Sequence, residues 1–94
     1  MRSNTKLNQM QKEVLKSMKQ NLPGVTLKNN RETTIAFREK GNTVEFALSV
    51  MSPEETKFRR KVGEYYALDR YNTGQTAYMK KVDFYDMLFN LCIE

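Results

Sequence analysis

Histidine is absent from this chain of 94 residues, and cysteine occurs once, as Cys92. Without histidine the chain lacks the commonest general base and the commonest metal ligand, and one thiol does not complete a zinc site. A single cysteine also excludes a disulfide framework and is typical of a reducing compartment. Because the usual pairs of nucleophile and base are missing as well, we expect no metal, no cofactor and no enzymatic activity.

Long apolar runs and glycine-rich loops are missing too. No run of apolar residues approaches the roughly 18 that cross a bilayer, and the first residues, MRSNTKLNQMQKEV, do not contain the apolar stretch of a signal peptide. The four glycines are scattered along the chain, so neither a phosphate-binding loop nor a nucleophile elbow is present. We expect a cytoplasmic protein that does not bind a membrane.

Acidic residues are in the minority, and the basic excess is unevenly distributed. The chain has 16 lysines and arginines against 11 acidic residues, a net charge of +5 and a pI near 9.4. Residues 1–30 alone hold six cations against one acid, Glu13. A domain that carries its positive charge on one side is suited to bind a polyanion.

The length and the 39% share of hydrophobic residues predict one domain with a single core, over residues 1–94. Apolar side chains at three- and four-residue spacing predict a first helix over residues 4–21. Ser3, Asn4 or Thr5 can cap its start, and Pro23-Gly24 ends it. The members of this apolar stripe are Leu7, Met10, Val14, Leu15, Met18 and Leu22.

From Val25 the hydrophobic period changes to two, which predicts β-strands. Turn residues at Asn29-Asn30 and Lys40-Gly41-Asn42 divide three strands, and such short turns favour antiparallel neighbours. The sequence therefore predicts a three-stranded antiparallel meander with one apolar face. The opposite face is expected to be polar and exposed to solvent, and it holds Thr34, Arg38, Thr43, Glu45 and Ser49.

The segment SPEETKFRRK carries the signals of a helix start. Ser52 suits the N-cap, Pro53 the first helical position, and Glu55 completes a capping box. The second helix is expected to end near Tyr71, because Asn72-Thr73-Gly74 is a stop signal.

The last 20 residues allow two predictions. We favour a short extended segment over residues 76–80 and then a helix from Phe84, capped by Asp83; one continuous helix from Tyr78 is the alternative. The predicted fold class is α+β, with a helix, a three-stranded antiparallel meander, a second helix, a short extended segment and a C-terminal helix in a two-layer sandwich.

Both of the first two predicted helices carry a ridge of cations. A solvated helix face usually mixes the two signs of charge in i, i+4 pairs, whereas these ridges have few acids. We predict a nucleic-acid interface that contacts phosphates and reads few base edges; a merely solvated surface is the alternative. The candidate binding residues are Lys12, Lys16, Lys19, Lys28, Arg31, Lys57, Arg59, Arg60 and Lys61.

The order of helix, three-stranded meander and helix over residues 4–71 resembles the double-stranded RNA-binding domain. That family uses its first helix, the loop between its first two strands and the basic start of its second helix. Here these positions are the lysines of the first helix, KNNR at 28–31 and KFRRK at 57–61, where the family has Lys-Lys-x-Ala-Lys. The resemblance implies that RNA is favoured over DNA.

Composition and the C-terminal segment suggest further partners. Ten lysines against six arginines, with eight asparagines, indicate an AT-rich coding sequence, and the size is typical of small phage proteins. The alternative function is therefore a viral inhibitor or protein-interaction module that binds and blocks a host protein in the host cytoplasm. The apolar surplus near the C-terminus predicts a homodimer with Tyr85, Leu88 and Phe89 at its interface.

Overall fold

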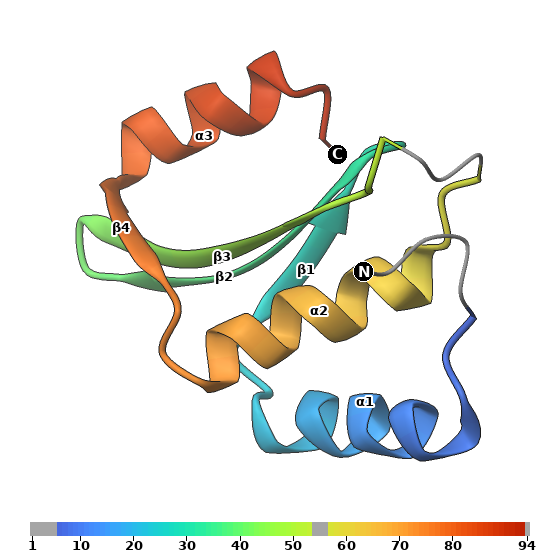
Figure 1. Cartoon of the computed structure of the whole chain (residues 1–94). Coiled ribbons are helices and arrows are strands. Elements are labelled where there is room, and N and C mark those ends of the chain that lie inside the picture. The colour runs from blue at the N-terminus through green and yellow to red at the C-terminus, as the bar shows by residue number, and fades with distance from the viewer. Residues whose placement is uncertain (1–5, 54–56, 94) are drawn as a thin grey trace.

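The computed structural model describes residues 6–53 and 57–93. It confirms the α+β class and the predicted order of elements, and the extended segment before the last helix is a fourth strand (Figure 1). The four strands form one antiparallel sheet in the order β1-β2-β3-β4. The elements are α1 (Gln9–Asn21), β1 (Thr26–Asn29), β2 (Thr33–Lys40), β3 (Thr43–Val50), α2 (Arg60–Asn72), β4 (Ala77–Lys80) and α3 (Lys81–Asn90).

Both predicted hairpin turns are present, and each has a local cause. The side-chain oxygen of Asn30 accepts hydrogen bonds of 2.7 Å from the backbone N–H groups of Glu32 and Thr33, which closes the turn between β1 and β2. Gly41 adopts φ 62° between β2 and β3, in the left-handed region that glycine enters without steric cost.

Helices cover both faces of the sheet, whereas the sequence pattern predicted two layers. Figure 1 shows α3 above the sheet, α2 below it, and α1 packed beneath α2. The core accordingly consists of two apolar clusters, one on each face. The molecule therefore has an α1–α2 side and an α3 side, separated by the sheet.

On the α3 side, large apolar side chains of β2 and β3 meet the last helix. Phe84 is fully buried, with its ring centroid 4.8 Å from that of Phe37 and 5.4 Å from that of Phe46. Leu88 is also buried here. Part of the apolar surplus of the C-terminal segment is therefore used in covering the sheet.

The prediction that the other sheet face is exposed to solvent is wrong. Thr34 and Ser49, on that face, are 0% and 3% exposed because α2 lies over them. Small side chains at Ala36 and Ala47 allow the helix to approach closely. At Gly63 the approach is closest, since a Cβ atom there would lie 2.2 Å from the Thr34 side-chain oxygen.

The first helix begins later than predicted, at Gln9 instead of near residue 4. Asn8 is the N-cap and exchanges hydrogen bonds of 2.8 and 3.0 Å with Gln11 in a capping box; the predicted caps at residues 3–5 lie outside the described residues. Of the predicted apolar stripe, Leu7, Leu15 and Met18 are buried, whereas Met10 and Val14 are exposed.

The second helix begins at Arg60, so the predicted start at Ser52-Pro53 is wrong. Glu55, the third part of that predicted capping box, lies outside the described residues. After β3 the chain has to pass from the sheet to the helical layer, and extended backbone advances about 3.3 Å per residue against 1.5 Å in a helix. This connection overrides the local capping signal. The predicted end is confirmed, because α2 ends at Asn72.

The last helix begins at Lys81, three residues before the predicted start at Phe84. Lys80 occupies the N-cap and Asp83 lies in the first turn, so Asp83 is not the cap. Within the described parts of the chain, no helix is long and apolar enough to cross a membrane.

Candidate nucleic-acid interface

The first two helices lie side by side with their N-terminal ends at the same end of the molecule (Figure 1). Leu15 and Met18 of α1 and Val62 of α2 belong to one buried cluster. The lysines of α1 and the cations at the start of α2 therefore come together, although about 40 residues separate them in the sequence.

Two adjacent hollows follow the line where the helices meet. The larger has a volume of about 490 Å³ and is lined by cations together with Leu7 and Val62. The smaller has a volume of about 280 Å³ and is lined by cations together with Leu15. Both hollows include Lys12 and Lys61, and among the described residues neither has an acidic side chain in its lining. We call the cations that line them the basic seam: Lys6, Lys12, Lys16, Lys19, Arg59, Arg60 and Lys61.

The N-terminal end of α2 adds to the positive charge of the basic seam. Its N-cap, Arg59, makes no side-chain capping hydrogen bond, and its first turn carries no acidic residue. The first backbone N–H groups of a helix form the positive end of its dipole. Here that end coincides with the cationic side chains of Arg60 and Lys61.

One acidic residue neutralises part of the positive charge of the basic seam. Lys19 donates a hydrogen bond of 2.9 Å to Glu64, whose side chain is 11% exposed. In the described parts of the chain, this is the one ion pair that reaches the seam. Lys12, Lys16 and Lys61 therefore offer their charge to solvent or to a partner.

Six of the nine predicted binding residues belong to the basic seam: Lys12, Lys16, Lys19, Arg59, Arg60 and Lys61. Lys57 is exposed just before α2 and lines neither hollow. Lys6 was not predicted, because it does not share the helical spacing of the α1 ridge.

Lys28 and Arg31 lie elsewhere. Lys28 pairs with Ile35 across the strands, and directly paired side chains lie on the same face of a sheet. It therefore lies on the α3 side, away from the basic seam. Arg31 lines a third hollow, of about 680 Å³, together with Phe58 and Cys92.

The three predicted interface residues have different environments. Leu88 is 4% exposed within the core and is not accessible to a partner, whereas Phe89 is 81% exposed. Tyr85 is 40% exposed and donates a hydrogen bond to the carboxylate of Glu39. The hydrogen bond raises the pKa of the Tyr85 hydroxyl.

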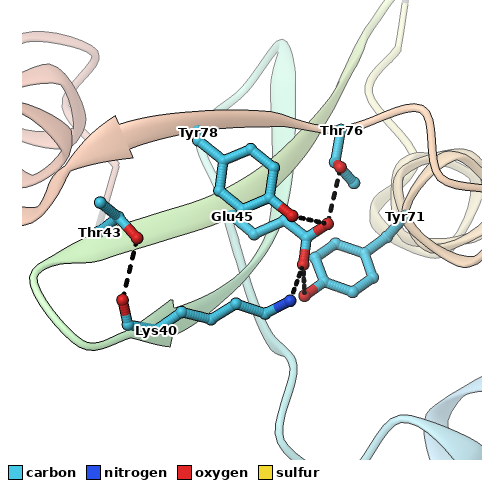
Figure 2. A network of polar contacts seen from close by, with 6 residues as sticks. All are labelled: Lys40, Thr43, Glu45, Tyr71, Thr76 and Tyr78. Carbon is cyan, nitrogen blue, oxygen red and sulfur yellow. Dashed lines mark hydrogen bonds and ion pairs between the residues drawn. The ribbon is translucent and has the colours of Figure 1, made fainter.

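A polar network around Glu45 is the feature that sequence reasoning missed (Figure 2). One carboxylate oxygen accepts from the Tyr71 hydroxyl at 3.0 Å and pairs with the Lys40 ammonium at 2.7 Å. The other accepts from the hydroxyls of Thr76 at 2.8 Å and Tyr78 at 3.1 Å. The alternation of polar and apolar residues along β3 predicted only that Glu45 lies on the polar face of the sheet. It did not predict the partners of its carboxylate.

The network holds Glu45 ionised. Hydrogen bonds from Lys40 and then Thr76 lower the pKa of the Glu45 carboxyl from 4.5 to about 2. A carboxylate offers about four acceptor positions, and four donors occupy them here. The network therefore fastens β4 and the end of α2 to β3, and it leaves no acceptor position for a substrate.

Comparisons with known proteins give no assignment: no family model, curated protein or solved structure matches the chain. The resemblance to the double-stranded RNA-binding domain rests on element order and on the positions of basic residues. The function is therefore argued from the geometry of the basic seam.

Proposed function

We propose that this chain is a non-enzymatic nucleic-acid-binding protein and that RNA is its favoured partner. The observation that supports this most strongly is the basic seam, where α1, α2 and the residues just before them bring seven cations to hollows that have no acidic side chain in the described part of their lining. Charges that are merely solvated have no need to gather from separate segments around two hollows. A polyanion, in contrast, gains from each cation that lies along its path.

The dimensions of the basic seam suit a phosphate backbone. Lys12 and Lys19 are seven residues apart on α1, which corresponds to about 10 Å along the helix axis. Phosphates of one strand advance about 3.4 Å per nucleotide along B-form DNA and somewhat less along A-form RNA, so this distance spans about three to four nucleotides. The exposed N-terminal end of α2 adds backbone donors of the kind that bind phosphate.

Recognition through the basic seam is expected to depend little on base sequence. Lysine and arginine contacts to phosphates fix position and orientation, and sequence is read at base edges. The preference for RNA is supported by the order α1, β1, β2, β3 and α2, which resembles the double-stranded RNA-binding domain. Such domains recognise the A-form shape and the 2′-hydroxyls of RNA.

The direct experiment is a salt titration of binding to a short RNA duplex, with a DNA duplex of the same sequence beside it. If four to six phosphates are neutralised, the slope of log K against log salt should be about −3 to −5. Binding should be tighter to the RNA duplex. Binding that does not change between about 50 and 300 mM salt, or no binding at low salt, would contradict the proposal.

A second candidate is the inhibitor of a host protein, which would use the same surface for an acidic partner. The basic seam itself favours it, because a positive patch without acidic neighbours among the described residues is complementary to an acidic protein surface. The absorbance ratio at 260 and 280 nm after purification at low salt separates the two. Co-purified nucleic acid supports the first function, and a clean protein that pulls down one host polypeptide supports the second.

A further inference from the structure

The last helix keeps a row of apolar side chains that the core does not use. Val82, Tyr85 and Phe89 are 66%, 40% and 81% exposed. Their spacings of three and four residues place them on one face of α3. Phe84 and Leu88, which cover the sheet, are buried, so the exposed row is additional to the packing of the monomer.

A hollow of about 600 Å³ lies beside the first turn of α3. Val82 and Tyr85 line it from the helix, Asn42 and Thr43 line it from the end of the β2–β3 turn and the start of β3, and Lys80 and Lys81 complete the lining. Phe89 lies seven residues beyond Val82, about 10 Å along the helix axis. One face of α3 thus has a hollow at its start and a protruding aromatic side chain at its end.

We propose that a second copy of this chain covers this face, with the two α3 helices antiparallel about a two-fold axis. In this arrangement Phe89 of each copy enters the partner's hollow and lies against the partner's Val82. The contact is made twice, as a two-fold axis requires. The protruding Phe89 side chain and the hollow lie two turns apart on the same face of α3, which is the spacing that this arrangement requires.

Charge favours the antiparallel direction. Lys80 and Lys81 lie at the start of α3, and the last backbone carbonyls of a helix form the negative end of its dipole. Antiparallel pairing places these lysines beside the C-terminal end of the partner's helix. Parallel pairing would place them beside their own copies and would leave Phe89 away from the hollow.

The dimer does not depend on the proposed function. The row lies on the α3 side of the sheet and the basic seam on the α1–α2 side (Figure 1). Two copies joined through α3 therefore leave both seams open. A short helix buries little area, so a dissociation constant in the micromolar range is expected.

Sedimentation at about 50 μM, where a micromolar dimer is populated, tests the interface. The native chain should sediment as a dimer, and Phe89→Asp should be folded and shifted toward the monomer, with a dissociation constant at least about tenfold higher. Met10→Asp is the matched control, because Met10 is 73% exposed on α1, and it should remain dimeric. Circular dichroism checks that each variant is folded.

Disulfide cross-linking tests the direction of pairing. In a Cys92→Ser background, a mixture of Val82→Cys and Phe89→Cys chains should form mixed dimers, because those positions face each other only in the antiparallel arrangement. A native chain that sediments as a monomer would overturn the proposal. A dimer that persists in Phe89→Asp would also overturn it. The same holds for disulfides that form only between two Val82→Cys chains, and for binding of only a different protein to this face of α3.

Discussion

On the α3 side of the sheet, Phe37 and Phe46 fill the space beneath Phe84. On the α1–α2 side, Gly63 lies so close to Thr34 that a Cβ atom would have no room. Large side chains fill the first contact, whereas the second is possible because glycine has no side chain. The two sides should therefore respond in opposite ways, one to lost volume and the other to added volume.

The same division separates charge from apolar surface. The basic seam belongs to the α1–α2 side, and the exposed row of Val82, Tyr85 and Phe89 belongs to the α3 side. A sheet covered on both faces thus gives a small domain two independent surfaces. We expect one to bind a polyanion and the other to bind a second copy of the chain.

The largest effect on stability is expected from removing volume on the α3 side. Phe84→Ala should lower the free energy of unfolding by about 3–5 kcal/mol, because it leaves a cavity beneath α3. Phe89→Ala is the matched control on the same helix, since Phe89 is 81% exposed. At concentrations where the chain is monomeric, its effect should be small. Urea unfolding measures both, and equal losses would contradict the assignment of Phe84 to the core.

The Glu45 network, on the other side, should make stability depend on pH. The folded pKa of about 2 lies below the usual 4.5, so the network stabilises the fold fully above pH 4.5. That contribution is lost as the pH falls from 4.5 toward 2. Glu45→Gln should cost about 2 kcal/mol at pH 7 and should flatten the loss of stability in this window.

The measurement for Glu45 is urea unfolding at a series of pH values from 7 to about 2.5. Glu13→Gln is the control for the loss of one carboxylate, since Glu13 is exposed on α1. If Glu45→Gln and the native chain lose stability in parallel as the pH falls, the network does not hold the carboxyl ionised.

The smallest of the three effects is expected from adding volume on the α1–α2 side. Gly63→Ala improves intrinsic helix propensity by about 1 kcal/mol, but the new methyl group meets the Thr34 side-chain oxygen. The variant should lose about 1–2 kcal/mol in net terms. Thr34→Ala in the same chain should recover part of that loss, which double-mutant analysis of urea unfolding measures. A Gly63→Ala variant more stable than the native chain would contradict the close approach.

Sequence alone predicted the features that local signals determine. The turns at Asn30 and Gly41, the end of α2 and the extended segment before α3 all follow from residues near one another in the chain. The start of α2 was predicted wrongly because Ser52-Pro53 is a strong local signal. The position of that start depends on the connection from β3 to the helical layer, which local residues do not encode.

The candidate site was predicted in separate parts. Helical spacing placed Lys12, Lys16 and Lys19 on one ridge, but only tertiary packing joins this ridge to Arg60 and Lys61. The period of two in the strands did not predict a role for Ala36 and Ala47. Their small size allows α2 to cover the face that was predicted to be exposed. Strand pairing, not charge, places Lys28 on the α3 side.

The central claim is that binding follows the basic seam and not the overall net charge. Lys61→Glu and Lys28→Glu change the net charge equally, but Lys61 lines both hollows and Lys28 lies across the sheet. In salt titrations with the same RNA duplex, Lys61→Glu should weaken binding about tenfold or more and reduce the slope of log K against log salt by about 1. Lys28→Glu should change the affinity less than about threefold. Equal losses for the two variants would contradict the account.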